Sequence, residues 1–312
     1  MKNKRLILVT GMPRSGTTAV GDVLGTARGA AILHEPLNYL VGLRDVPHYF
    51  VLPGGGEVTN DTLDQWVSDM QSLSLHYKPG LFPKEKGLRR LVKQVVGGRS
   101  VNSYRRCLWT PGIDTLIWKD PFAALSARYL HEHYKMPVVV MLRNPWAVAA
   151  SFKRMRWAFD LDEIMSRIQQ AGQPHFRLND KAWKLRHEPA ANAALLWFII
   201  YSSLHAQLAP EGGLIGLSLD ELIQDPATVY AELFDLLGLP WTESVKRGVL
   251  KRYQGKQSEP RVPIGEKAHD RKRDLASMNQ YWRKLLSADE QALVSAVCEE
   301  LWESLAGLRM VN

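Results

Sequence analysis

The sequence has few cysteines and no long apolar run. Its two cysteines, Cys107 and Cys298, are too few for a disulfide framework in 312 residues, so a reducing compartment is the simpler interpretation. The apolar stretch over residues 193–204 is too short to cross a bilayer. The basic N-terminus runs into a short apolar stretch that Pro13 and Arg14 interrupt, unlike a signal peptide. We therefore expect a cytoplasmic protein without a membrane span.

The sequence also lacks the charge pattern of a nucleic-acid-binding protein. Lys and Arg number 40 against 32 Asp and Glu, a net charge of +8. A nucleic-acid-binding protein would concentrate such an excess in a patch with interleaved aromatic residues. Here part of the excess lies in residues 267–273 and the rest is scattered. We expect no nucleic acid as a partner, and an anionic small ligand or an acidic substrate instead.

What the sequence does contain is an alternation of buried strands and helices. Apolar, β-branched runs predict strands over residues 5–10, 30–33, 115–118, 137–142 and 214–218. Helix starts are predicted at Asn144-Pro145, at Asp225-Pro226 and at the capping box Ser287–Glu290. The alternation predicts an α/β fold with a doubly wound, mostly parallel sheet flanked by helices, and with ligands at the carboxyl ends of the strands.

Residues 40–112 interrupt this alternation with glycine-rich, irregular sequence. The strand–helix pattern resumes afterwards, so we interpret them as an irregular or helical insertion after the second strand and not as a separate domain. We expect residues 1–312 to form a single domain, and the insertion to form a cleft for a substrate.

A glycine-containing loop follows the first strand. Residues 11–18, Gly-Met-Pro-Arg-Ser-Gly-Thr-Thr, have the length and glycine spacing of a P-loop, whose N–H groups at a helix N-terminus favour an anion. A nucleotide-kinase loop needs Lys after its second glycine, where this chain has Thr17, and its only cation is Arg14. A turn that binds nothing is the alternative, which the preceding strand and following helix disfavour.

The substitution in this loop suits a donor with less charge. A terminal sulfuryl group carries one negative charge where a γ-phosphate carries about two. It therefore needs less neutralisation, and no Mg²⁺ need be held between phosphates. We expect the protein to require no metal.

Two motifs resemble those of sulfotransferases that use 3′-phosphoadenosine 5′-phosphosulfate (PAPS). The run Pro13-Arg14-Ser15-Gly16-Thr17-Thr18 is similar to the family's 5′-phosphosulfate loop. The run Leu142–Ser151 is similar to its 3′-phosphate motif, in which an Arg at a strand end and a Ser eight residues later bind the ribose 3′-phosphate. The resemblance assigns these roles to Arg143 and Ser151, and implies a P-loop-like fold with PAPS as co-substrate and PAP as product.

The resemblance extends over nearly the whole chain, but is thin between residues 40 and 112. Residues 219–226 resemble a family segment in which Leu219 replaces the usual Tyr, so an aromatic contact from that position is not expected. Residues 273–287 resemble the closing segment of the family. We expect a basic loop over residues 256–286 to close over the nucleotide, with Arg273 as its contact. A solvated loop is the alternative.

The second strand ends in a candidate general base. Transfer to a hydroxyl needs a group that takes the acceptor's proton. His34 and Glu35 lie at this strand end, and the carbohydrate and tyrosyl-protein branches of the family, which the chain most resembles, use a Glu there. Because neighbouring strand residues point to opposite faces, only one of the two should face the site. We favour Glu35; a surface carboxylate before Pro36 is the alternative.

Transfer also needs cations for the charge that builds on the leaving phosphate. Lys119, at another strand end, resembles the lysine that stabilises the leaving group in the tyrosyl-protein branch, and Arg14 would share this work. An ordinary surface lysine is the alternative for Lys119.

These residues predict a sulfotransferase that moves a sulfuryl group from PAPS, by direct in-line transfer, to the hydroxyl of a small-molecule or glycan acceptor. One alternative is a P-loop kinase, which the missing lysine after Gly16 disfavours. Another is a nucleotide-binding module without turnover, which Glu35 and Lys119 at strand ends disfavour. The sequence predicts neither the acceptor nor the oligomeric state.

Overall fold

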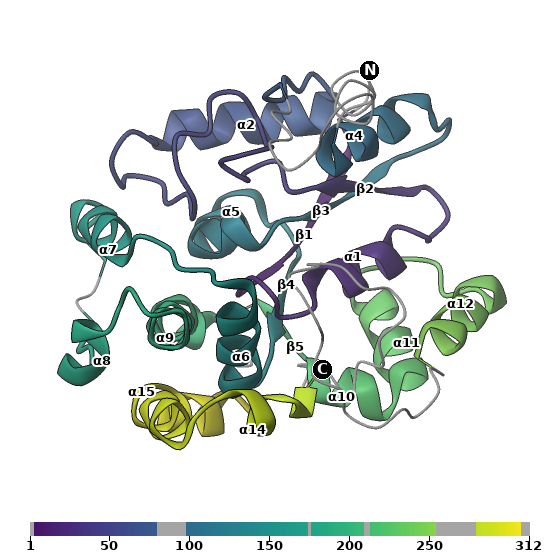
Figure 1. The fold of residues 1–312 in the computed structure, drawn as a ribbon. Helices are drawn as coiled ribbons and strands as arrows, with labels where there is room; N and C mark the ends of the chain where they lie inside the picture. The colour runs from purple at the N-terminus through teal and green to yellow at the C-terminus, as the bar shows by residue number, and fades with distance from the viewer. Residues whose placement is uncertain (1–2, 80–97, 174–175, 209–212, 254–278, 307–312) are drawn as a thin grey trace, which may run out of the picture.

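A computed structural model describes residues 3–79, 98–173, 176–208, 213–253 and 279–306. Within them, five parallel strands form one sheet in the order β2-β3-β1-β4-β5 (Figure 1). The strands are β1 (Arg5–Gly11), β2 (Ala30–His34), β3 (Thr115–Lys119), β4 (Val138–Leu142) and β5 (Ile215–Ser218). All five predicted strands are present, and the predicted doubly wound, parallel sheet flanked by helices is confirmed.

Helices cover both faces of the sheet, which is why its strands read as continuous apolar runs. Leu6 and Leu8 of β1 face one core, while Ile7 and Val9 face the other. The first core is covered by α5 (Ala127–Tyr134), α6 (Pro145–Met155), α9 (Pro189–Leu208) and α15 (Ala288–Ala306). The second is covered by α1 (Thr17–Leu24), α10 (Leu219–Gln224), α11 (Pro226–Leu236) and α12 (Glu243–Tyr253).

The predicted helix starts are formed by side-chain caps. Asn144 Oδ1 accepts a hydrogen bond from Ala147 N at 3.2 Å, at the start of α6. At the start of α15, the Ser287 hydroxyl accepts from Glu290 N at 3.3 Å, and the Glu290 carboxylate accepts from Ser287 N at 2.7 Å. Such caps satisfy donors that have no partner within the helix, so these short motifs fix the element boundaries locally.

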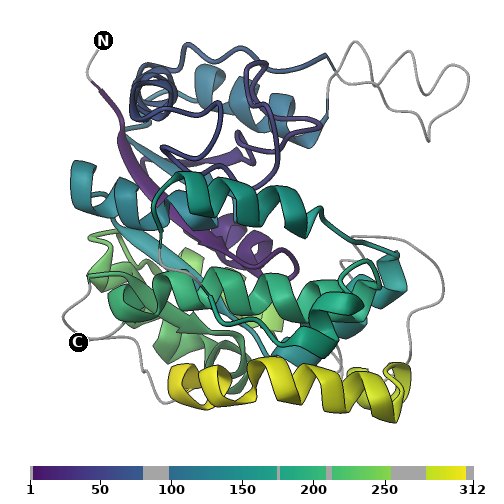
Figure 2. The ribbon, with the colours of Figure 1, turned by 90° about the vertical axis from the view of Figure 1, so that its left-hand side faces the viewer.

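The longest apolar helix, α9, lies between α6 and α15. Figure 2 shows this layer from the side, with α15 in yellow at its outer edge. Because α9 has partners around it, it is apolar on nearly all sides. Among the described residues, no helix is both long and apolar enough to span a membrane.

The insertion over residues 40–112 contains two described helices, α2 (Asn60–Ser72) and α4 (Arg99–Trp109), and α4 packs against the edge strand β2. Its N-terminal part is therefore less irregular than the glycines suggest. Thr59 caps α2 by accepting from Thr62 N at 3.1 Å, and the buried residues Leu63, Trp66, Val67 and Met70 recur at helical spacing. Residues 80–97 lie outside the described part.

Four further elements are described. They are η1 (Pro121–Ser126), α7 (Leu161–Gln170), α8 (Asp180–Lys184) and α14 (Trp282–Leu285).

Candidate active site

The carboxyl ends of four neighbouring strands meet at one edge of the sheet. Lys119 at the end of β3 is in register with His34 at the end of β2 and with Val9 of β1. Gly11, at the end of β1, is in register with Met141 of β4. The residues that follow these strands are therefore brought together, although they lie far apart in the sequence.

The loop between β1 and α1 is bent by residues with positive φ. Gly11, Arg14 and Gly16 have φ angles of 129°, 76° and 105°. At Gly11 a Cβ would lie 2.7 Å from the Met141 carbonyl oxygen, so only glycine fits there. Gly16 is the N-cap of α1 and has no side chain to occupy the helix N-terminus. An anion can therefore approach the first turn of α1, where N–H groups and the helix dipole favour it.

Two aromatic residues of α9 bind the main chain at the end of β4, and one of them also binds the loop; the sequence analysis did not identify them. The Tyr201 hydroxyl donates to Met141 O at 2.5 Å and accepts from Met12 N at 3.2 Å. Trp197, one turn earlier, donates from Nε1 to Arg143 O at 3.0 Å. A signal was present, since a buried Tyr or Trp in an apolar helix needs a partner for its polar atom.

Three of the predicted nucleotide contacts lie together beside the loop. Arg143, which follows β4, is buried, and its Nη1 donates to the carbonyl oxygen of Arg14 at 2.5 Å. The Arg14 side chain donates from Nε to the hydroxyl of Ser151 in α6 at 3.0 Å. Arg143 and Ser151 thus both contact Arg14, one at its main chain and one at its side chain.

Arg143 is also linked to the C-terminal part of the chain. Its Nε donates to Asn279 Oδ1 at 3.3 Å, and the Asn279 amide donates to Asp220. Burial lowers the pKa of Arg143, and attraction from Tyr281 and Asp220 opposes this; a guanidinium stays charged in either case.

The other predicted loop residues occupy the same turn. Ser15 and Thr17 are buried, while Thr18 and Arg14 are half-buried; Pro13 is buried beside them. Leu219, where the family has an aromatic residue, packs against Gly16, with its Cδ1 3.3 Å from the position of a Cβ there. Arg273 lies outside the described residues, as do residues 256–278 of the basic loop predicted over residues 256–286.

Glu35 and Lys119 form an ion pair and a hydrogen bond at the ends of β2 and β3. Asn38 Nδ2 donates to the other Glu35 oxygen at 2.8 Å. Burial alone would raise the pKa of Glu35, but attraction from Lys119 and His34 and hydrogen bonds from Lys119 and Asn38 outweigh it and lower the pKa to about 2. Glu35 is therefore a carboxylate at neutral pH, and Lys119 is not an ordinary surface lysine.

Asp120 fixes the turn that carries Glu35. Its carboxylate accepts from Leu37 N at 2.6 Å and from Phe122 N at 3.0 Å, and Glu35 has a φ of 49°. Burial, followed by repulsion from Glu35, raises the pKa of Asp120 to about 7, against the two backbone hydrogen bonds and the attraction of Lys119. The sequence analysis gave Asp120 no role.

His34 is the buried neighbour of Glu35. The residue is 5% exposed, and its backbone N–H donates to the hydroxyl of Ser103 in α4 at 3.0 Å. The structure therefore brings the carboxylate of Glu35, and not the imidazole of His34, into hydrogen-bond contact with Lys119.

A row of aromatic rings connects the two parts of the site. Tyr49 lies near Glu35: burial, and then the charge of Glu35, raise its pKa to about 12. At the other end of the row, the Arg14 guanidinium lies over the Trp157 ring, 6.0 Å from its centroid. The row consists of Tyr49, Phe159, Phe152 and Trp157, with neighbouring centroids 5.1, 5.9 and 5.9 Å apart.

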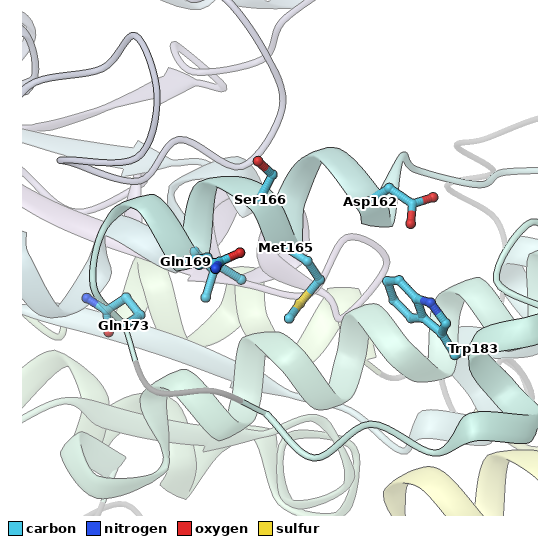
Figure 3. Close-up of a pocket in the computed structure, with 7 residues that line it drawn as sticks. Asp162, Met165, Ser166, Gln169, Gln173 and Trp183 are labelled. Carbon is cyan, nitrogen blue, oxygen red and sulfur yellow. The ribbon is translucent and has the colours of Figure 1, made fainter.

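A pocket of about 270 Å³ lies elsewhere, between α7 and α8 (Figure 3). It contains none of the predicted site residues, and its lining, which includes the carboxylate of Asp162, offers no cation for a phosphate or sulfuryl group. The lining residues are Asp162, Met165, Ser166, Ile168, Gln169, Gln173 and Trp183.

The chain is similar to known sulfotransferases. The model of a family described as "Sulfotransferase family" matches residues 7–243. A solved sulfotransferase, STF9 from Mycobacterium avium, is 14% identical, with 100% of this chain and 79% of that chain covered and a TM-score of 0.45. The mouse sulfotransferase SULT7A1 complexed with PAP is 11% identical, with 97% and 87% covered and a TM-score of 0.44. No curated protein matches the sequence significantly.

Proposed function

The chain belongs to the sulfotransferase family, and we propose that it transfers a sulfuryl group from PAPS to the hydroxyl of a small-molecule or glycan acceptor. One observation carries the proposal. Two features lie at the same edge of one sheet. One is the loop at Arg14, which can hold an anion; the other is the Glu35–Lys119 pair, in which Glu35 can accept a proton and Lys119 can stabilise negative charge.

The donor would be held by the residues around the loop. The N–H groups at the start of α1, with Pro13, Arg14, Ser15, Gly16, Thr17 and Thr18, would bind the 5′-phosphosulfate. Arg143 and Ser151 would bind the ribose 3′-phosphate. The fit is supported by the place of Arg143, which is buried beside the loop and contacts Arg14 O, because a phosphate bound there would gain a charge-assisted contact. Arg273 would join from the adenosine end.

When bound, PAPS supplies the sulfuryl group and the leaving phosphate. Glu35 takes the proton of the acceptor hydroxyl as the oxygen–sulfur bond forms and the bond from sulfur to the phosphate oxygen breaks. Lys119 and Arg14 stabilise the negative charge that develops on the departing phosphate. For this, Lys119 must turn from Glu35 toward the donor. The loss of its attraction leaves burial to raise the pKa of Glu35, which makes it a stronger base when it is needed.

The acceptor would approach from the side of the insertion, residues 40–112. Glu35 is followed by Tyr39, which is 41% exposed and lies against Tyr49 at a centroid distance of 5.5 Å. These rings, at the Glu35 end of the aromatic row, support a cleft with an apolar wall beside the base. The face of a sugar or phenol ring would pack against such a wall, with its hydroxyl directed to Glu35.

The first test is ligand preference. Thermal shift with PAP, ATP and NAD should show stabilisation by PAP alone, because binding to the folded state raises its stability by mass action. Turnover of PAPS should then be measured with a panel of monosaccharides and phenols. Stabilisation by ATP and not by PAP would favour a kinase.

The second test is the base. Glu35→Gln should keep PAP affinity and lose turnover by about 10²–10⁴-fold, because the amide cannot accept a proton. His34→Ala is the matched variant at the neighbouring position. If Glu35→Gln turns over like the wild type while His34→Ala is inactive, the assignment of the base is wrong.

A further inference from the structure

Gly21 lies where α1 crosses the end of β3. A Cβ at Gly21 would lie 2.8 Å from Cγ of Lys119 and 3.0 Å from its Cβ. On another side, Cδ1 of Ile32 in β2 lies 3.3 Å from the same point. Favourable contacts between carbon atoms are about 3.5–4.0 Å long. The methylene stem of Lys119 therefore runs directly against the backbone of α1, through space that only a glycine leaves open.

The backbone at this position gives no other reason for glycine. Gly21 is inside a helix and is absent from the glycines with positive φ, which include Gly11 and Gly16. Glycine in a helix interior is less stable than alanine. The feature that only glycine provides here is room for Lys119.

The Cβ–Cγ part of the Lys119 side chain is held in place. That side chain is 1% exposed, and its Cβ is fixed by β3, which pairs with strands on both sides. A side chain at position 21 would force Cγ into another rotamer or move α1 off the sheet. Either change displaces Nζ from the carboxylate of Glu35.

We propose that Gly21 is a positioning residue for Lys119, a role that rests on the proposed function of Lys119 in sulfuryl transfer. The same helix begins at the loop that would hold the donor and, one turn later, fixes the path of the lysine. The geometry of α1 thus sets the distance between donor and lysine, and a displacement of about 1 Å in such an arrangement can cost about 10²-fold in rate.

Four variants test this: Gly21→Ala, Lys119→Ala, the two together, and Gly248→Ala as the matched control. Gly248 is also inside a helix, α12, and a Cβ there would meet nothing within 4 Å. Turnover is measured as PAP formation from PAPS, with the best acceptor of the panel, and PAP affinity is measured by calorimetry. Gly21→Ala should lose at least about tenfold in kcat with PAP affinity within about twofold, and Gly248→Ala should behave like the wild type.

The double variant separates positioning from a general defect. In the Lys119→Ala background, Gly21→Ala should cause no further loss in kcat, because both changes remove one interaction. Additive losses, or a wild-type kcat in Gly21→Ala beside an impaired Lys119→Ala, would overturn the inference. A wild-type kcat in Lys119→Ala would instead overturn the proposed role of Lys119.

A second readout does not depend on turnover. The groups that face Glu35 are Lys119, His34, Asn38, Asp120 and Tyr49. If Gly21→Ala displaces only Lys119, the pH dependence of its unfolding free energy should match that of Lys119→Ala, while Gly248→Ala keeps the wild-type dependence. A wild-type dependence in Gly21→Ala would overturn the inference. If Gly21→Ala does not fold, adding Lys119→Gly, which removes both Cβ and Cγ of Lys119, should restore the stability of Lys119→Gly alone, and failure to do so would also overturn the inference.

Discussion

The ammonium group of Lys119 is enclosed, whereas its partner Glu35 is open on one side. The Lys119 side chain is 1% exposed and that of Glu35 is 18% exposed. A buried charge is costly unless it is paired, so Glu35 satisfies Lys119 in the absence of a donor. The Glu35 carboxylate can therefore be reached from solvent, as the proposed transfer to an acceptor hydroxyl requires.

Replacing Lys119 by Met should reverse the effect of Glu35 on stability. In the wild type the pKa of Glu35 is about 2, below its ordinary value of 4.5. The ionised carboxylate therefore adds to the free energy of unfolding above pH 4.5, and this contribution is lost as pH falls toward 2. Without Lys119, burial should raise this pKa above 4.5. The free energy of unfolding should then fall as pH rises from 4.5 through the raised pKa. Urea unfolding from about pH 3 to 7 measures the difference; Lys251→Met, at an exposed position, is the control. Parallel curves would contradict the pairing.

The pH profiles of turnover should separate the two states of Glu35. The profile of kcat/KM reports the free enzyme and that of kcat the bound complex. In the proposed mechanism Lys119 leaves Glu35 when the donor binds, so the acidic limb of the kcat profile should lie at higher pH than that of the kcat/KM profile. Steady-state kinetics with PAPS over about pH 4–9 would show this. If the two acidic limbs coincide, the ion pair between Glu35 and Lys119 stays intact during transfer.

Arg143 should be the reason for any preference for a 3′-phosphate. A charge-assisted contact contributes roughly 1.5–3 kcal/mol, so adenosine 5′-phosphosulfate should bind at least about tenfold more weakly than PAPS. Arg143→Ala should remove this preference. Because Arg143 also donates to Arg14 O, both nucleotides should lose some affinity for the variant. Calorimetry with both ligands measures the coupling between the Arg143 side chain and the 3′-phosphate. Fully additive losses would show that Arg143 serves only the loop.

Tyr201→Phe should weaken PAP binding without changing any charge at the site. It leaves Met12 N–H and Met141 O without the hydroxyl that joins them, and an unsatisfied buried group costs about 1–3 kcal/mol. The loop should loosen and PAP affinity should fall by about tenfold. Tyr230→Phe is the control, because it removes a hydroxyl contact to Tyr253 in the other core. Equal PAP affinity in both variants would contradict the role of Tyr201.

Turnover should not require a divalent metal. The sulfuryl group carries a single charge, and Arg14, Lys119 and the N-terminus of α1 together suit it. Activity in excess EDTA should equal that in Mg²⁺. Loss of activity that Mg²⁺ restores would count for a kinase.

The sequence by itself determined the elements that depend on local signals. The five strands are apolar runs bounded by turn residues, and Asn144, Asp225 and Ser287 mark helix starts through hydrogen bonds within a few residues. The loop at residues 11–18 was predictable for the same reason, because glycine spacing and the following helix define it. The helix α2 carried such signals too, but the sequence analysis predicted only an irregular or helical insertion there and gave no helix bounds, since the surrounding glycines suggested irregular structure.

Only the tertiary structure decided which side chains meet. Glu35 and Lys119 belong to different strands, and their contact depends on the register of β2 with β3. Tyr201 reaches Met12 and Met141 only because α9 packs across the end of β4, and Gly21 meets Lys119 only because α1 crosses β3. Periodicity in a sequence defines which face of an element is apolar, but the distance between atoms on two elements is set by how those faces pack.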